Sequence, residues 1–333
     1  MRLGEERIEP GEAEAIAALV KSNLPTVWTE GETGKRGQHA KHHGLVEGEF
    51  LVHEHLPEGF AQGIFQPGAR YACLVRFSNG SRGDDREADA RGMAIKLLEV
   101  PGDKLMPGGG DGREQDFILV DFPTYFTATR DQYAAFNRYA LPVLALRGNG
   151  VSPARLLRAA WGAVMLLARH RDLSRRARRF AGRHAGSVLG LTFHSTTPYL
   201  LGDGRAVKYK AIGRGPDRPP ADHPGALREA LWAELGKEPV RFDFGVVVQT
   251  DPLAHPVEDP TVEWEAAGAD FVELAALVLP QQENTPDKDA RAETLNFLPW
   301  NSLAEHRPLG FINRARREVY RAMSRLRHRK TRT

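Results

Sequence analysis

The sequence predicts an α+β fold, in which an antiparallel sheet or closed β-barrel is surrounded by helices. Short strand patterns with hairpin-like spacing dominate before residue 130 and between residues 190 and 280, and a helical stretch separates the two groups. Runs of strands interrupted by one helical block are typical of this class. The chain has no strand–GxGxxG–helix unit, which argues against a doubly wound dinucleotide-binding fold.

The spacing of apolar residues predicts the individual elements. Residues 11–22 have the spacing of a helix. Alternating or short apolar runs bounded by Gly and Pro predict strands at 49–56, 70–78, 92–99, 117–121, 206–212, 242–249 and 271–278. Further helices are expected at 130–147, 152–185 and about 308–327. We therefore expect an N-terminal helical arm, 1–30, and a barrel domain, 31–333, with a helical insertion at about 130–185.

The composition is that of a soluble globular protein. Of its 333 residues, 41% are hydrophobic and 27% are charged, and this length is ample to bury a core. The formal net charge of +3 is too small to predict a nucleic-acid partner. The single cysteine, Cys73, excludes an intramolecular disulfide and indicates a reducing compartment. Because no signal peptide or membrane-spanning segment is recognisable, we expect a cytoplasmic protein.

The C-terminal helix carries the first chemical signal. Arg316, Tyr320 and Arg327 fall within roughly 40° of one another on a helix of about 100° per residue. A guanidinium one turn from a phenol favours the phenolate, because a nearby opposite charge lowers a pKa. Tyrosinate is a known axial ligand of haem iron. Taken alone, the pattern is more typical of a solvated basic helix with one amphipathic tyrosine.

Two earlier segments add an imidazole and more guanidinium groups. Arg36 and His39 lie in RGQHAKHHG, and Arg76 and Ser78 lie in VRFSNG. Arginines that are distant in sequence suit the two propionates of a haem, because guanidinium matches carboxylate geometry. A neutral His39 above the iron would be able to accept a proton from a peroxide, with Ser78 as its hydrogen-bond partner. The ordinary alternatives are a loop histidine and outward-facing strand residues.

The alternative role for His39 is that of a metal ligand. This residue belongs to a local histidine cluster whose spacing does not match the HExxH motif, and the other members are His42, His43, His53 and His55. The chain has no GxSxG elbow, which argues against hydrolase chemistry. Cys73 lies in an apolar run and is interpreted as a small buried hydrophobic residue.

In residue types, spacing and order, four segments resemble those of the catalase family. They are RGQHAK, VRFS, DARGMAIK and RREVYRAMSRLR, and the resemblance runs from about residue 30 to residue 329. It implies a haem b buried in an antiparallel β-barrel with surrounding helices. This chain looks like a compact version of that fold, because it lacks the C-terminal extensions of full-length catalases.

The resemblance also implies roles for individual residues. Arg36, Arg76 and Arg327 would contact the haem propionates. His39 would be the distal histidine, with Ser78 behind it. Tyr320 would be the axial iron ligand and Arg316 its charge partner. Phe136 and Phe126 are candidates for stacking on the haem, although their spacing differs from the family pattern and core packing accounts for both.

Three departures from the family pattern bear on activity. The family's distal asparagine falls at Asp121, and a carboxyl group donates a hydrogen bond to a peroxide only when it is protonated. The valine that narrows the family's channel corresponds to Gly80, which predicts a wider entrance. A valine beside the distal histidine is replaced by Gln38. The insertion at 153–183 is expected to pack its apolar face on the barrel, with capping of the entrance as the alternative.

We therefore expect a haem-dependent peroxidase or catalase-like oxidoreductase that reduces hydrogen peroxide or organic hydroperoxides through a ferryl intermediate. The candidate catalytic residues are His39, Asp121 and Ser78, and the electrons come from an organic donor or a second peroxide. Two alternatives stay open: a fatty-acid hydroperoxide isomerase of the allene oxide synthase type, and a non-catalytic haem-binding protein. We expect no nucleic-acid partner and no membrane span, and a monomer and a homodimer are both compatible with the sequence.

Overall fold

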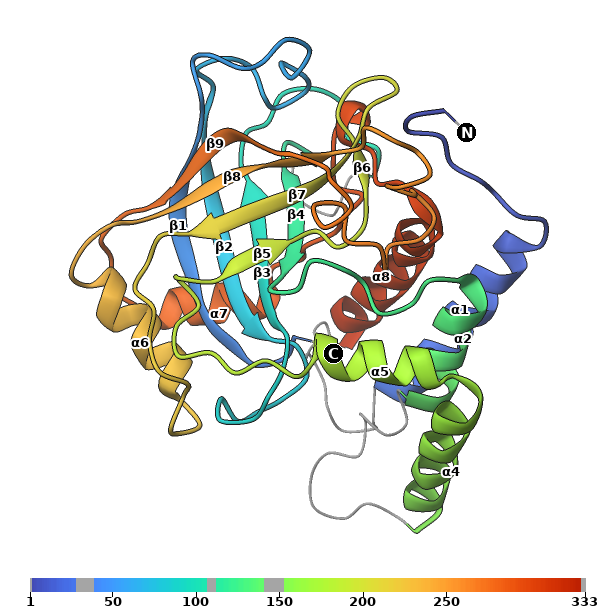
Figure 1. The fold of residues 1–333 in the computed structure, drawn as a ribbon. Coiled ribbons are helices and arrows are strands. Elements are labelled where there is room, and N and C mark those ends of the chain that lie inside the picture. The colour runs from blue at the N-terminus through green and yellow to red at the C-terminus, as the bar shows by residue number, and fades with distance from the viewer. Residues whose placement is uncertain (1, 28–38, 107–111, 141–152, 331–333) are drawn as a thin grey trace.

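The computed structural model describes residues 2–27, 39–106, 112–140 and 153–330, and it is built around a β-barrel (Figure 1). Nine strands form one antiparallel sheet in the order β5-β4-β3-β2-β1-β9-β8-β7-β6, and β5 also pairs with β7. This last pairing closes eight of the nine strands into a ring. The predicted α+β barrel with surrounding helices is therefore confirmed.

The strands come in two groups separated by a helical stretch, as predicted. The first group is β1 (His42–Val52), β2 (Arg70–Asn79), β3 (Arg91–Leu97) and β4 (Gln115–Val120). The second is β5 (Thr192–His194), β6 (Tyr199–Leu200), β7 (Ala206–Gly213), β8 (Val240–Val248) and β9 (Phe271–Leu279). β5 and β6 were not predicted, because strands of two or three residues are too short to show an alternating pattern.

β1 begins earlier than the sequence predicted because both of its faces are covered there. A Cβ atom on Gly44 would lie 2.5 Å from the Trp232 ring, so helix α6 (Ala226–Leu235) packs directly on the strand. A strand that is buried on both faces does not alternate between apolar and polar residues. α6 itself was also missed, as was α7 (Pro286–Thr294), which is mostly charged and lies beside β1.

Aromatic rings fill the interior of the barrel. Phe50 on β1 contacts Phe244 on β8, with 4.9 Å between the ring centroids, and Phe117 on β4 contacts Tyr209 on β7 at 4.7 Å. These contacts join strands that are not neighbours in the sheet, so they cross the interior of the ring. Cys73 is buried as predicted, and burial raises the pKa of its thiol.

One buried histidine belongs to this interior. His306 lies in the short 3₁₀ helix η2 (Ala304–His306). Its Nε2 accepts the backbone N–H of Ile64 at 3.0 Å, and its Nδ1 lies 2.9 Å from the hydroxyl of Tyr209. Because Nε2 is an acceptor, the neutral ring carries its proton on Nδ1 and donates it to Tyr209. Burial lowers the pKa of His306 to about 3, which keeps the ring neutral.

The remaining helices lie on the side of the barrel away from α6 (Figure 1). They are α1 (Glu12–Val27), α2 (Arg130–Ala135), the π-helix η1 (Phe136–Ala140), α4 (Pro153–Arg169), α5 (Arg171–Phe180) and α8 (Gly310–Lys330). α1 packs on α8, where Leu19 joins a cluster with Phe311 and Ile312. The helices predicted from the sequence at 11–22, 130–147, 152–185 and about 308–327 all fall in these regions. None of the described helices is both long enough and apolar enough to cross a membrane.

The helical insertion differs from its prediction in two ways. The expected single helix at 152–185 is two helices, because His170 leaves the helical conformation between α4 and α5. The apolar face of α4 does not pack on the barrel, since Leu157 and Trp161 are exposed. The buried residues of α4 instead contact η1 and α5.

Candidate active site

One rim of the barrel gathers the residues predicted to lie around the distal histidine. Strand register places them there, because His42 pairs with Ser78, Ser78 with Gly92, and Gly92 with Val120. His39 lies three residues before the start of β1, and Asp121 directly follows β4. Residues from four separate segments therefore meet at one end of the ring.

His39 is held by three hydrogen bonds and an uncommon backbone conformation. Its φ angle is 54°, in the left-handed region that few residues other than glycine adopt. Its backbone N–H donates to the Gly80 carbonyl at 2.8 Å, and its own carbonyl accepts Nη2 of Arg76 at 3.0 Å. Its Nδ1 lies 3.0 Å from the Ser78 hydroxyl. The predicted partnership of Ser78 with His39 is present as a contact.

Gly92 completes the support of His39, a role that was not predicted from the sequence. A Cβ atom at this position would lie 2.5 Å from Nδ1 of His39 and 2.9 Å from the Ser78 hydroxyl oxygen. The imidazole therefore occupies the space that any other residue would need at position 92. The DARGMAIK motif contains this glycine, but its contact with His39 becomes apparent only from the pairing of Ser78 with Gly92. We call His39, Ser78 and Gly92 the His39 site.

Asp121 contacts the backbone of β3. Its Oδ1 accepts the N–H of Arg91 at 2.7 Å, and its own N–H donates to the Arg91 carbonyl at 3.0 Å. Burial raises the pKa of the Asp121 carboxyl to about 6, against the lowering effect of the Arg91 N–H. Asp121 thus fixes the residue that precedes Gly92. Its proposed part in the chemistry stays a prediction.

Gly80 does not open an entrance by lacking a side chain. A Cβ atom there would lie 3.0 Å from the Ala90 carbonyl oxygen and 3.1 Å from Oδ1 of Asp89. The missing side chain points into packed protein, and the Gly80 carbonyl is the acceptor for His39. The interpretation of Gly80 as a cause of a wider channel is therefore wrong. Sequence could not reveal the direction of a Cβ bond at the end of a strand.

Of the other residues predicted to contact haem, the structure describes the side chains of Arg76 and Phe136. The buried Arg76 donates through Nε to the Ala292 carbonyl at 3.1 Å and thereby joins α7 to the loop of His39. Phe136 packs against Phe126, with 4.4 Å between the ring centroids. Arg36 lies outside the described residues, as does the side chain of Arg327. Their roles toward haem stay predictions.

On α8, Arg316 and Tyr320 face each other as the helical spacing predicted. Nη2 of Arg316 lies 3.4 Å from the Tyr320 hydroxyl, and the guanidinium carbon lies 5.3 Å from the centre of the phenol ring. The guanidinium also contacts Thr197 Oγ1 at 3.5 Å and Asn313 Oδ1 at 3.3 Å. We call Arg316 and Tyr320 the Tyr320 site.

Arg316 is a buried cation whose partners are neutral oxygens. Among the described residues it forms no ion pair with Asp or Glu, whereas Arg314 binds Glu6, Glu12 and Glu258. Burial acts to lower the pKa of Arg316, but the oxygens of Tyr320 and Tyr199 outweigh it and raise the pKa above its usual value. A buried charge requires a counter-charge.

The two sites are connected through the segment that follows β5. His194 on β5 pairs with Val120 at the end of β4, beside Asp121. Three residues further on, Thr197 donates to Asn313 at 3.0 Å and contacts Arg316. The first turns of α8 are therefore fixed to the same rim of the barrel that carries the His39 site.

Tyr125 is a further aromatic residue near the Tyr320 site that sequence reasoning missed. Burial and the neighbouring Tyr133 raise the pKa of its phenol well above the usual value, while Arg316 acts to lower it. Its ring stacks on Phe126 at 4.3 Å. The sequence signal was weak, because one tyrosine in the loop after β4 has no pattern to distinguish it.

The histidines that follow His39 do not converge on a metal. His42 pairs with Glu293 at 3.1 Å, His43 with Asn79 at 2.9 Å, and His53 with Glu273 at 2.9 Å. Each thus has a different partner. In the part of the chain that the structure describes, no group of three or more His, Cys, Asp or Glu residues could hold a metal ion.

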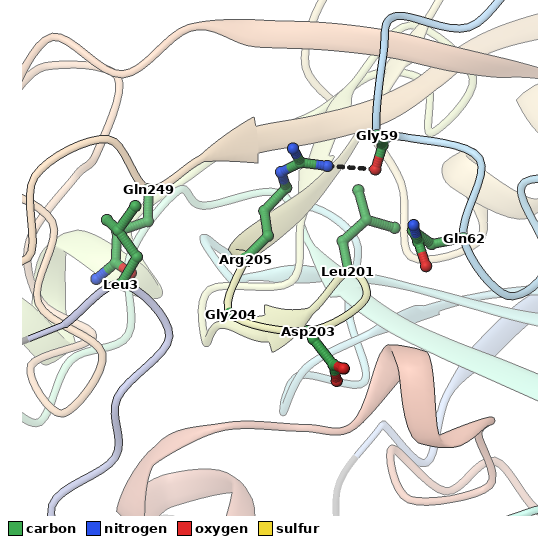
Figure 2. Close-up of a pocket in the computed structure, with 8 residues that line it drawn as sticks. All are labelled: Leu3, Gly59, Gln62, Leu201, Asp203, Gly204, Arg205 and Gln249. Carbon is green, nitrogen blue, oxygen red and sulfur yellow. Dashed lines mark hydrogen bonds between the residues drawn. The ribbon is translucent and has the colours of Figure 1, made fainter.

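A cavity of about 330 Å³ lies elsewhere on the protein (Figure 2). Arg205 projects beside it, donates to the Gly59 carbonyl and lies 4.6 Å from the Phe60 ring centre. The lining residues are Leu3, Gly59, Gln62, Leu201, Asp203, Gly204, Arg205 and Gln249. None of the predicted site residues lines this cavity.

Comparison with known proteins identifies similar structures. No protein-family model matches the chain, and no curated protein matches it. A fungal catalase superimposes with a TM-score of 0.69 and 17% identity, covering 98% of this chain and 65% of its own. A bacterial catalase superimposes with a TM-score of 0.65 and 17% identity, covering 97% of this chain and 62% of its own. Catalase A from Saccharomyces cerevisiae superimposes with a TM-score of 0.64 and 17% identity, covering 98% of this chain and 67% of its own. The chain therefore spans about two thirds of the length of these catalases, and its fold is catalase-like.

Proposed function

We propose that this protein is a haem-dependent oxidoreductase that reduces hydrogen peroxide or organic hydroperoxides. The observation that carries the proposal is the Arg316–Tyr320 pair, in which a buried guanidinium without a carboxylate partner in the described chain lies beside a phenol. A tyrosine oxygen held beside a buried guanidinium is an axial ligand suited to ferric haem. The residues present therefore fit a haem b, with Tyr320 as the ligand.

The His39 site supports the second half of the proposal. Haem iron, when bound, would supply the electrons that cleave the O–O bond of the peroxide. In our proposal Nδ1 of His39 donates to Ser78, so Nε2 is the basic nitrogen. Nε2 takes the proton from the peroxide and returns it to the departing oxygen. Gly92 leaves room for the ring, and Arg76 holds the loop that carries it.

The balanced reaction consumes two protons and two electrons, converting a hydroperoxide to an alcohol and water. In our proposal the electrons come from an organic donor, or from a second hydrogen peroxide that is oxidised to dioxygen. Hydrogen peroxide, organic hydroperoxides and lipid hydroperoxides are all substrates to test. The contacts of Gly80 remove the argument from channel width that favoured a fatty-acid hydroperoxide isomerase.

The proposal is tested with haem-loaded protein in three steps. We expect a Soret band with high-spin, tyrosinate-ligated ferric features, which Tyr320→Phe alters and Tyr71→Phe, a half-buried control on β2, does not. Added peroxide should be reduced to alcohol and water, and His39→Ala should remove most of this turnover at equal haem occupancy. Absence of a Soret band would overturn the proposal, and haem without turnover would make the protein a non-catalytic haem binder. An epoxide or ketol from a lipid hydroperoxide would instead identify an isomerase.

A further inference from the structure

Helix α4 turns a broad apolar face away from the protein. Leu156, Leu157, Trp161, Val164 and Leu167 are each between 48% and 74% exposed. They make up five of the eight large exposed hydrophobic side chains in the described chain. On a helix of about 100° per residue they span an arc of roughly 140°. This arrangement is a contiguous face rather than a scatter of single exposed residues.

The packing of the opposite side of α4 fixes this orientation. A Cβ atom on Gly162 would lie 2.5 Å from the Tyr139 carbonyl oxygen, so the helix backbone is in direct contact with η1. Ala159 is buried on the same side, and Leu166 packs on the cluster around Phe126 and Leu173. Rotating the helix would separate this close contact. The apolar face therefore points outward because glycine and alanine form the packed side.

Basic residues border the apolar face. Residues 153–183 contain nine arginines and a single acidic residue, Asp172, although the whole chain has a net charge of only +3. Exposed arginines follow the apolar face along the end of α4 and the length of α5, at Arg169, Arg171, Arg175, Arg178 and Arg179. Asp172 is itself paired with Arg175 at 3.3 Å. α4 and α5 lie outside the barrel (Figure 1), and the apolar and basic side chains named above are exposed.

We propose that α4 and α5 bind this protein to the surface of an anionic lipid bilayer. The apolar face of α4 would enter the boundary between headgroups and acyl chains, with Trp161 at the depth that tryptophan prefers. The arginines of α5 would bind lipid phosphates, and their apolar stems would lie along the interface. A second copy of this chain is the less favourable occupant, because pairing two α4 faces would bring two sets of arginines together.

The proposed function gives this surface a purpose. If the protein reduces organic hydroperoxides, docking would place it where oxidised lipids form. This last step rests on the proposed function, whereas the binding itself does not. Binding and turnover are therefore measured separately, and either can fail without the other.

The test measures binding of the full-length haem-loaded protein to vesicles by flotation. We expect binding to vesicles of phosphatidylglycerol and phosphatidylcholine, at least tenfold weaker binding to phosphatidylcholine alone, and weakening by salt. The double variant Leu157→Ser/Trp161→Ser should lose this binding. Leu253→Ser removes a still more exposed leucine, 82% accessible in the loop after β8, and this variant should bind as the wild type does.

A second measurement reports the depth of α4 directly. Brominated lipids should quench part of the tryptophan fluorescence of the wild type, and Trp161→Phe should remove that part. Equal binding by wild type and the double variant would overturn the proposal. So would the absence of binding to anionic vesicles, or a dimer in solution that the double variant dissociates.

Discussion

The imidazole of His39 lies in the space that a side chain on Gly92 would fill, with 2.5 Å between Nδ1 and the position of a Cβ atom. This relationship joins a loop that precedes β1 to the first residues of β3. Ser78, which pairs with Gly92 across the sheet, then lies within hydrogen-bonding distance of the same nitrogen. The position of His39 is therefore determined by the sheet register as much as by its own loop.

Gly92→Ala should displace the imidazole and reduce peroxide turnover by roughly tenfold or more, with a loss of stability of about 1–3 kcal/mol from overpacking. Turnover of haem-loaded protein and urea unfolding measure the two effects. Gly83→Ala is the control, because a Cβ atom there meets nothing within 4 Å. Unchanged turnover in Gly92→Ala would mean that the position of His39 does not limit the reaction.

Arg316→Met should leave the stability of haem-free protein unchanged or slightly higher, because it removes a buried charge without a carboxylate partner in the described chain. It should also weaken haem binding, since Tyr320, the proposed ligand, loses its neighbouring cation. Arg314→Met is the matched control on the same helix. It should cost about 3 kcal/mol, because it leaves Glu6, Glu12 and Glu258 without their shared partner. Urea unfolding and haem titration distinguish the two variants, and equal destabilisation by both would contradict this view of Arg316.

Asp121→Asn should change the pH dependence of stability between about pH 4 and pH 6. Burial raises the pKa of this carboxyl in the folded state from 3.8 to about 6. The folded protein then binds more protons than the unfolded chain in that window, so the wild type loses stability as the pH rises through it. The loss is worth about 3 kcal/mol at about 1.4 kcal/mol per pKa unit. Relative to the wild type, Asp121→Asn should therefore gain stability from pH 4 to pH 7. If the free energy of unfolding depends on pH in the same way for both proteins, the raised pKa of Asp121 is refuted.

His306→Gln should weaken the acid sensitivity of the fold. Burial lowers the pKa of His306 from 6.5 to about 3, so the unfolded chain binds the extra proton between these values. The stability that this residue contributes is present above pH 6.5 and is lost as the pH falls, by about 1.4 kcal/mol per pH unit. Glutamine retains one donor and one acceptor for Tyr209 and Ile64 but does not titrate. Urea unfolding at pH 4.5 and pH 7 should show a smaller difference in the variant than in the wild type.

Local patterns in the sequence were sufficient for the class of fold and for the pairing of Arg316 with Tyr320. A helix places residues four apart on one face whatever surrounds it, so this contact was predictable from spacing alone. The two groups of strands were recognisable because short apolar runs bounded by Gly and Pro are typical of strands. The order of the four motifs predicted the catalase-like fold that the structural comparison confirms.

What surrounds these residues was decided by contacts between segments distant in the chain. The direction in which a Cβ atom would point at Gly80 and at Gly92 depends on strand register. At Gly80 it would point into packed protein, and at Gly92 it would point into the space that the His39 imidazole occupies. The outward face of α4 depends on the close contact of Gly162 with Tyr139, since an amphipathic pattern does not reveal which face meets the protein. Periodicity thus determined most of the elements, although β5, β6, α6 and α7 were missed. Packing between the elements decided the environment of each side chain, because burial and hydrogen bonding arise only when the segments meet.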